Sequence, residues 1–509
     1  MSDPERGQVK PPLPLGLGSA TVRVSLIFLG VAFVSLLLGD IEITTSDPWG
    51  EMLRFAGGFL TPSLDSIDTL ATALLRTVGF AFVGVALGSI AGYLLMLFFD
   101  KALVRAFCAF IRAIHELFWA LIFLQFFGLH PLTGVLAIAI PYAGVFAKVY
   151  AEINDETDPL PGLVLPPIRS RFIQALFLKL PQAFAHVKSY TAYRLECGFR
   201  SSAILGFVGL PTLGFYLESA FVQGHYSEVA AMLMIFYLII ATMRWWLRPR
   251  LLPLYVLASP FFLGEGLPIV WSNVGRFFTE DIVPAPLKNG VSWSSPSELW
   301  EWFSPIAQEQ IVPGLWNTVI LTQIALVATA ILTLIAFVLV SKHFGGAKRR
   351  SVGHLFLVVG RSTPEYILAY MLLQLWGPSM LPAVVALALH NGCIIGHLIG
   401  RQSNELVLRP GTGTGTDLYF FELLPRLYRP FLAFLFYRWE IIMRETAILG
   451  VLGIYTLGFY IDSAIENIRF DVALLLILVT AMLNIAIDML SRKLRAGLRL
   501  TTMPTPDVP

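Results

Sequence analysis

Two stretches of this chain are near copies of each other: YRLECGFRSSAILGFVGLPTLGFYLESA, from Tyr193 to Ala220, and YRWEIIMRETAILGVLGIYTLGFYIDSA, from Tyr437 to Ala464. They align without a gap at a constant offset of 244, and 16 of their 28 positions are identical. Three matches are between charged residues, which a shared apolar composition does not explain: Arg194 with Arg438, Glu196 with Glu440, and Arg200 with Arg444. We infer that the chain contains an internal duplication.

The composition is that of a membrane protein. Of the 509 residues, 56% are hydrophobic and only 14% are charged, where a soluble protein would carry roughly a quarter. The net charge of +2 gives no reason to expect nucleic acid as a partner. Apolar runs long enough to span a bilayer, about 20 residues each, recur along the chain. The three cysteines (Cys108, Cys197 and Cys393) have neither pairing nor metal-ligand spacing, and we interpret them as small apolar residues.

We predict an all-α polytopic protein with about twelve transmembrane helices. The predicted spans are 22–39, 69–99, 112–127, 133–150, the first repeated stretch, 228–243, 251–263, 315–340, 354–376, 380–399, the second repeated stretch and 472–490. Of these, 251–263 is the shortest. Residues 1–21, polar and rich in Pro and Gly, are expected to form a cytoplasmic leader.

The duplication extends upstream of the repeated stretches. The pattern Arg-x3-Glu recurs at an offset of 249, as Arg112–Glu116 and Arg361–Glu365, each followed by a matched Gln and Gly. Both copies share one orientation, which predicts a parallel repeat about a pseudo-two-fold axis along the membrane normal, with the pathway between the halves. The predicted halves are 22–250, with its core at 69–243, and 251–509, with its core at 316–490.

The charges between the spans predict the orientation. A cytoplasmic N-terminus puts every Lys/Arg cluster on the cytoplasmic side and both acidic segments outside, so both termini are expected inside. The outer segment 264–313 is rich in Trp, which is typical of elements that lie along a membrane interface.

The repeated charges allow two interpretations. Glu196 and Arg200, like Glu440 and Arg444, are four residues apart on a predicted helix, an arrangement that favours intrahelical ion pairs closing the end of the bundle. Alternatively, arginines of both halves meet at the pseudo-axis and attract an anion, because charges within a membrane are functional candidates. The two Arg-x3-Glu pairs upstream are open to the same two interpretations.

The repeated glycines also leave alternatives open. Gly206, Gly209 and Gly214 and their counterparts could pack helices closely, or could mark a broken helix that lines a cavity. We expect packing in general and a break near Pro211, which the second copy lacks. Past the break, a hydrogen bond from Thr212 or Thr456 to its own backbone is a simpler expectation than one to a substrate.

Other motifs do not indicate an enzyme. The run Gly411–Thr416 lacks a preceding strand and a Walker-type lysine, and is expected to be a flexible turn. His390 and His397 have no carboxylate or cysteine at ligand spacing and are interpreted as polar core residues. With no nucleophile–base arrangement, we expect a protein that is not an enzyme and binds neither a metal nor a cofactor.

The order Leu-Pro, Tyr-Arg-x-Glu-x3-Arg, then Ala-Ile-Leu-Gly-x2-Gly resembles the permease subunits of ATP-binding-cassette (ABC) importers, in their phosphonate/phosphite/phosphate branch. Pro364–Tyr366 and the turn at Gly377 are also similar to that branch. The resemblance covers about 69–243 and 316–490, one permease unit in each half. It implies a type I importer permease fold of two six-helix repeats fused in one chain.

The resemblance further implies a cytoplasmic coupling loop in each half that docks on a separate ATPase subunit. The residues it assigns to these loops are Glu152, Glu156 and Pro181 in the first half and Glu405, Arg409 and Pro425 in the second. Neither loop keeps the Glu-Ala-Ala of the family, and the Gly-rich stretch after Gly453 is reduced. The changed loops are compatible with a diverged ATPase or with weak docking of one loop, and the reduced Gly-rich stretch is compatible with a changed substrate.

We therefore expect a bacterial inner-membrane importer permease for phosphonate, phosphite or phosphate. Expected partners are the lipid bilayer, two ATPase subunits and an extracytoplasmic binding protein. The candidate residues of the substrate path or inter-half charge cluster are Arg194, Glu196, Arg200, Arg438, Glu440, Arg444, Arg112, Glu116, Arg361, Glu365, Thr212 and Thr456. The alternatives are an ion-coupled secondary transporter with parallel repeats and a non-transporting membrane scaffold.

Overall fold

A computed structural model describes residues 19–63, 67–158, 171–248, 250–288, 290 and 295–501 of the chain. All regular structure in these residues is helical. By length and hydropathy, seven helices can cross a membrane, or ten if each of three bent helix pairs forms one span. This confirms the all-α polytopic fold. Most of the expected leader and residues 159–170 lie outside the described part.

The helices of the first half repeat in the second. The first set comprises α1 (Ala20–Leu38), α2 (Pro48–Gly58), α3 (Ile67–Met96), α4 (Ala102–Ala113), α5 (Glu116–Phe127), α6 (Pro131–Asp155), α8 (Arg171–Ile173), α9 (Leu180–Ile204), α10 (Leu213–Val222) and α11 (Tyr226–Trp246). The second comprises α12 (Leu252–Ala258), α13 (Trp271–Arg276), α14 (Ser295–Ile306), α15 (Val312–Val340), α16 (Ala347–Ser362), α17 (Glu365–Trp376), α18 (Met380–Glu405), α19 (Leu424–Ile448), α20 (Leu457–Glu466) and α21 (Phe470–Gly497). Short π-helical segments precede α9 and α19, at Gln174–Lys179 and Leu418–Leu423.

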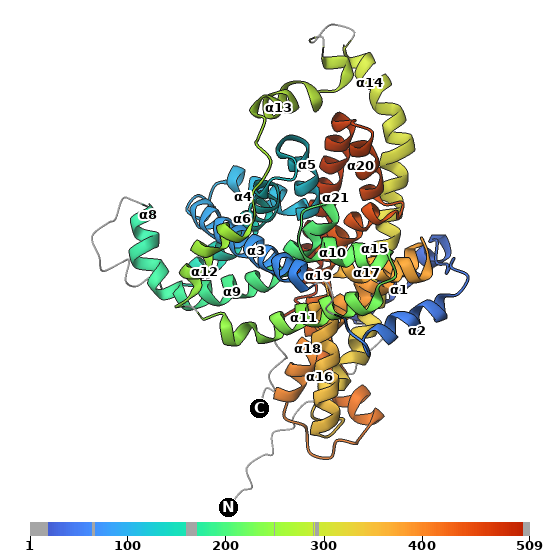
Figure 1. The fold of residues 1–509 in the computed structure, drawn as a ribbon. Coiled ribbons are helices and arrows are strands. Elements are labelled where there is room, and N and C mark those ends of the chain that lie inside the picture. The colour runs from blue at the N-terminus through green and yellow to red at the C-terminus, as the bar shows by residue number, and fades with distance from the viewer. Residues whose placement is uncertain are drawn as a thin grey trace, which may run out of the picture.

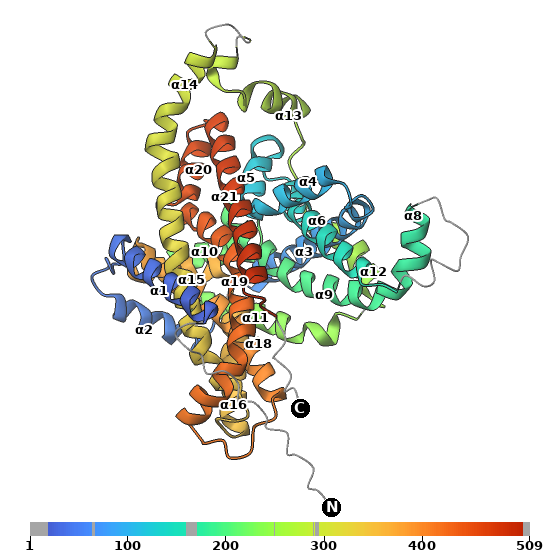
Figure 2. The ribbon, with the colours of Figure 1, turned by 180° about the vertical axis from the view of Figure 1, so that it is seen from behind.

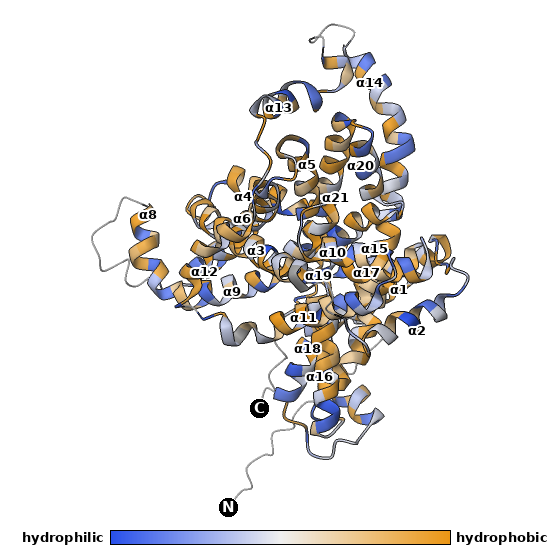
Figure 3. Cartoon of the chain, viewed as in Figure 1, coloured by the Kyte–Doolittle hydropathy of each residue, from blue (hydrophilic) through white to orange (hydrophobic). Residues whose placement is uncertain are grey.

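The two halves form arms that diverge from a shared centre. Figure 1 shows α3, α6 and α9 running toward α8 in one arm, and α15 and α18 running toward α16 in the other. The view from behind shows the same division (Figure 2). Hydrophobic residues dominate the helices of both arms, and hydrophilic residues gather around α13 and α14 and beyond α16 (Figure 3).

Each arm is built on one closely packed helix pair, α3 with α6 and α15 with α18. In the first, Gly84, Gly88 and Gly92 of α3 contact α6 so closely that added Cβ atoms would crowd its side chains. In the second, the glycines lie on the other partner: Gly392, Gly396 and Gly400 of α18 face α15. Small residues let membrane helices approach in this way. The packing is therefore repeated although the glycines are not.

The first helix of each half packs on the core of the other half. α1 lies against α15, where the Gln323 amide donates to the Phe28 carbonyl oxygen at 3.1 Å. The short helix Leu252–Phe262, which includes α12, lies against α3, where Tyr255 packs on Phe82. The expected span at 251–263 is thus a short apolar helix that does not reach spanning length. The first helix of each predicted half, before and after the boundary at residue 250, thus packs on the other half.

Both repeated stretches contain a broken helix. α9 ends in a 3-10 turn and meets α10 at 53°, and α19 meets α20 at 43°. At each break a glycine adopts a left-handed conformation, Gly209 with φ +87° and Gly453 with φ +91°. Such φ values are routine only for glycine. The expected break near Pro211 is confirmed, but the second half bends in a similar way without a proline, which was not expected.

The segments after the breaks are held by matched hydrogen bonds. The first backbone N–H of α10 donates to the Thr77 hydroxyl at 2.9 Å, and that of α20 donates to Thr318 at 3.0 Å. Thr212 and Thr456 are buried, and each donates at 3.3 Å across the break to a backbone carbonyl of the preceding helix, Ala203 of α9 and Ala447 of α19.

The segment 264–313 between the cores of the two halves, which contains α13 and α14, lies across one end of the molecule. Phe277 lies against Phe126 of α5, at 5.1 Å between ring centroids, and against Phe470 of α21, at 5.9 Å. The Trp302 indole donates to the Asp471 carboxylate at 3.1 Å. This insert therefore contacts both halves, on the side away from α8 and α16 (Figure 1).

Candidate functional site: a cavity between the halves

A cavity of about 340 Å³ lies where the two halves meet. Its walls come from α5, α6 and α9 of the first half and from α17, α18, α19 and α21 of the second. Charged side chains from both halves line it: Arg194, Arg200, Arg438, Arg444 and Arg495, with Glu116, Glu365 and Glu445. Arginine outnumbers glutamate, so the cavity carries net positive charge and suits an anion.

Two arginines at equivalent positions brace the interface symmetrically. Arg200 donates to the Arg361 carbonyl oxygen at 3.0 Å, and Arg444 donates to the Arg112 carbonyl oxygen at 3.0 Å. The accepting carbonyls lie in the last turns of α16 and α4, where helices leave carbonyl groups without intrahelical partners. Each half thus satisfies a helix end of the other.

Arg112 forms the main ion pairs across the interface. It donates to Glu440 at 2.9 Å and to Asp488 at 2.7 Å, and both carboxylates belong to the second half. An intrahelical pair between Arg112 and Glu116, one of the two interpretations of this motif, does not form, because α4 ends between these residues and the chain turns by 87° into α5. Arg361, the counterpart of Arg112, has no ion pair among the described residues.

Arg194 and Arg438 are equivalent in sequence but differ in their surroundings. Arg194 lies among three tyrosine rings, with its guanidinium carbon 5.4 Å from the centroid of Tyr190, to whose hydroxyl it donates at 2.8 Å. The other two rings are Tyr142 and Tyr193, both at 5.8 Å. Phe434 replaces Tyr190 in the second half, and Arg438 has no hydrogen bond or ion pair within the described chain. Its guanidinium is therefore available to a ligand.

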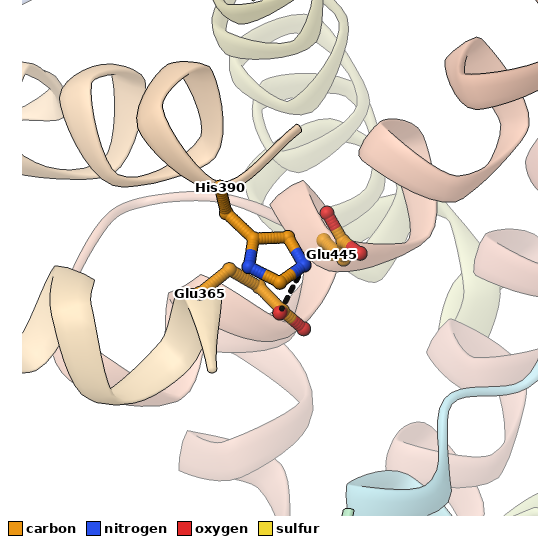
Figure 4. Close-up of side chains that lie close together, drawn as sticks. All are labelled: Glu365, His390 and Glu445. Carbon is orange, nitrogen blue, oxygen red and sulfur yellow. Dashed lines mark ion pairs between the residues drawn. The ribbon is translucent and has the colours of Figure 1, made fainter. Parts of the chain in front are cut away.

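The acids that line the cavity also differ between the halves. Glu116 accepts a hydrogen bond of 2.6 Å from Ser201. Its counterpart Glu365 lies 3.4 Å from the His390 imidazole, with Glu445 close by (Figure 4). The ligand atoms of these three residues lie within 4.8 Å of one another, a spacing that could hold a metal ion. Arg200 lies 3.4 Å from the same imidazole nitrogen, and its positive charge opposes a cation there.

Comparisons with known proteins agree with this arrangement. The chain is 26% identical over 473 residues to the phosphate-import permease protein PhnE of Mycolicibacterium smegmatis, covering 86% of this chain and 87% of that protein. It is 25% identical to the phosphite transport system permease protein PtxC of Stutzerimonas stutzeri, covering 42% of this chain but 82% of that protein. The chain is thus similar to permease proteins of phosphate and phosphite transport systems. One relative matches 86% of this chain, whereas most of the other matches 42% of it, as expected for two permease units in one chain.

Two further results complete the comparisons. A putative phosphite transport system permease protein of the same Stutzerimonas species, HtxE, is 30% identical over 26% of this chain and 52% of its own length. No family model and no solved structure matches the chain.

The residues expected in the permease's coupling loops lie at the far ends of the two arms, away from the cavity. Glu152 and Glu156 are at the end of α6, and Glu405 ends α18, with Arg409 in the loop that follows. Pro181 and Pro425 lie in the first turns of α9 and α19. The middle of the first loop lies outside the described residues.

The structure brings most of the predicted charge cluster together and leaves part of it outside the cavity. Arg194, Arg200, Arg438, Arg444, Glu116 and Glu365 line the cavity, whereas Arg112, Glu440, Glu196, Arg361, Thr212 and Thr456 do not. Sequence reasoning missed His115, Tyr142, Tyr190, His390, Glu445 and Arg495 in the cavity wall and Asp488 beside it. Two signals were available: Glu445 replaces Ser201 in the aligned repeat, and Asp488 is an acid within an apolar span.

Proposed function

We propose that the chain is the transmembrane permease of a bacterial ABC importer that moves a small phosphorus oxyanion inward by alternating access. The observation that carries this proposal is the arginine-rich cavity between two halves of a permease homologue. The relative that matches nearly the whole chain is a phosphate-import permease, and the others are phosphite permeases. Phosphate, phosphite and phosphonate share a compact anionic head group that guanidinium groups bind well.

The remaining parts of the proposal follow from the importer assignment. The permease lies in the cytoplasmic membrane with both termini inside, as the distribution of Lys and Arg favours. Two separate ATPase subunits dock at the coupling loops, an extracytoplasmic binding protein delivers the substrate, and the chain carries no cofactor. Exposed aromatic side chains support docking at the loops, with Phe177 in the first and Phe420 and Phe421 in the second.

Arg438 is the residue that we expect to contact the anion first. It lines the cavity, and no described residue neutralises its guanidinium through a hydrogen bond or ion pair. Replacing Arg438 with Gln should lower uptake of radiolabelled phosphate or phosphite at limiting concentration by roughly tenfold or more, the effect of one lost charge-assisted hydrogen bond. The assay requires cells whose other uptake systems for these anions are disabled.

Arg194→Gln is the matched control. Because tyrosines surround Arg194, we expect this substitution to reduce the amount of folded protein more than the apparent affinity of uptake. Equal losses of affinity in both variants would contradict the role given to Arg438. Purification without an associated ATPase, together with uptake driven by an ion gradient, would overturn the importer proposal as a whole.

A further inference from the structure

The acids of the cavity are paired differently in the two halves. Glu116 and Ser201 form an acceptor and a donor joined at 2.6 Å. The equivalent positions of the second half hold Glu365 and Glu445, two carboxyl groups at the same corner of the cavity. The donor of the first half has thus been replaced by a second acceptor.

The donors supplied by the protein do not satisfy this pair. Within the described chain, Glu445 accepts one hydrogen bond, from the Asn391 amide at 3.0 Å, and Glu365 has His390 at 3.4 Å as its single polar partner. A carboxylate offers about four acceptor positions, and buried polar groups are nearly always hydrogen-bonded. The Glu365 side chain is only 12% exposed, so bulk water reaches little of it. The corner therefore has acceptor capacity for a ligand.

The nearby cations do not remove this capacity. Arg200 already donates to the Arg361 carbonyl and lies beside the His390 imidazole, and it has no hydrogen bond to either carboxyl group. Arg438 lines the same cavity without a hydrogen bond. A single ligand could bind both groups if its negative charge contacts Arg438 and its O–H group donates to the acids.

We propose, on the basis of the proposed function, that Glu365 and Glu445 accept a hydrogen bond from a P–OH group and thereby determine specificity. Phosphate, phosphite and phosphonate each have a protonated form that combines anionic oxygens with a hydroxyl group. Sulfate has similar shape and charge but brings only acceptors at neutral pH. Two carboxyl groups this close share at most one proton of their own, so at least one carboxyl oxygen remains an acceptor that a P–OH group can satisfy and sulfate cannot.

The test measures binding of radiolabelled phosphate to the purified full chain in lipid nanodiscs, with phosphite and sulfate as competitors. We expect phosphite to compete with phosphate and sulfate to compete at least roughly tenfold more weakly, as expected for a lost hydrogen bond to a charged group. Glu445→Ser, which recreates the acceptor–donor pair of the first half, should reduce the preference for phosphate over sulfate by roughly tenfold. Glu365→Gln provides a second variant if Glu445→Ser fails to fold.

Glu116→Gln is the matched control and should keep the phosphate-to-sulfate ratio, because Ser201 already satisfies this acid. An unchanged ratio in both Glu445→Ser and Glu365→Gln would overturn the inference and leave the proposed function intact. Failure of the parent chain to bind any of the anions would instead contradict the function itself. A titration with zinc alone that showed stoichiometric binding, lost in Glu445→Ser, would replace the inference with a cation site.

Discussion

The two halves of this chain share a backbone arrangement but differ in their polar side chains. Each has a glycine break, a threonine hydroxyl that caps the following helix, and an arginine that bonds to a carbonyl of the other half. The side chains around these shared features differ: tyrosines surround Arg194, whereas Arg438 forms no hydrogen bond or ion pair within the described residues, and Glu445 replaces Ser201. Both copies thus retain the residues that shape the backbone. The polar residues suited to binding a ligand lie mainly on the cavity wall of the second half.

The coupling loops show a similar asymmetry. In the first half, the Gln182 side chain accepts a hydrogen bond from the backbone N–H of Asp158 at 3.2 Å. In the second, Arg426 at the matching position donates to the Val407 carbonyl at 2.8 Å and also pairs with buried Glu422 at 2.6 Å. Both loops are therefore hydrogen-bonded to the residue that follows the proline of the next helix. In the second half this residue is charged and also forms a buried ion pair.

The largest effects are expected where the halves are alike. A Cβ atom on Gly214 would collide with the Ala203 carbonyl oxygen, and one on Gly458 would collide with that of Ala447. The neighbouring atoms belong to the backbone and cannot rotate away. Gly214→Ala and Gly458→Ala should each lower the amount of folded protein several-fold or more, because overpacking costs at least about 1–3 kcal/mol. Size-exclusion chromatography of detergent-solubilised protein measures this amount.

Gly30→Ala is the control, because nothing lies near a Cβ atom at that helical position. It should leave the amount of folded protein unchanged. If Gly458→Ala were tolerated and Gly214→Ala were not, the two breaks would not be equivalent, and the shared backbone would be a weaker constraint than we infer.

The next largest effect is expected at Arg112, which forms ion pairs across the interface, whereas its counterpart Arg361 does not. Arg112→Ala leaves half-buried Glu440 without its ion pair and leaves buried Asp488 with Arg492 as its remaining cation, which should cost about 1.5–3 kcal/mol, as for a lost hydrogen bond to a charged group. Arg361→Ala removes no ion pair and should cost about 1 kcal/mol or less, as most substitutions outside such networks do. Thermal unfolding of the two variants in the same detergent measures the difference.

The triple variant Arg112→Ala/Glu440→Gln/Asp488→Asn should recover part of the loss, because it removes the uncompensated charges together with the arginine. Equal destabilisation by Arg112→Ala and Arg361→Ala would mean that the cross-interface ion pairs contribute nothing specific.

The sequence predicted the shared features well. Repeated apolar runs and matched charges led to the all-α fold and the duplication, and one of the two interpretations of the repeated arginines placed them between the halves. These depend on hydrophobic periodicity and on residues that recur at a fixed offset, and both are visible without a structure.

Sequence reasoning failed where contacts join residues far apart in the chain. Spacing of four residues predicted a pair between Arg112 and Glu116, but a sharp turn separates them and brings Glu440 and Asp488 to Arg112 instead. His390 is buried, as expected of a polar core residue, but its acidic neighbours Glu365 and Glu445 were missed because they lie on other helices. Tertiary packing decides such partners, and local spacing does not encode it.

The smallest effect is expected at Pro211, a clear sequence difference between the two repeated stretches. Pro211 has Tyr455 as its counterpart, yet both helices break at the preceding left-handed glycine, so the proline does not cause the bend. Pro211→Ala should lower the free energy of unfolding by less than about 1 kcal/mol, mainly because the unfolded chain gains freedom. Gly209→Ala should cost more, about 1–2 kcal/mol, because the left-handed conformation disfavours any Cβ. Thermal unfolding of both variants gives the order, and a larger loss for Pro211→Ala would restore the proline as the cause of the break.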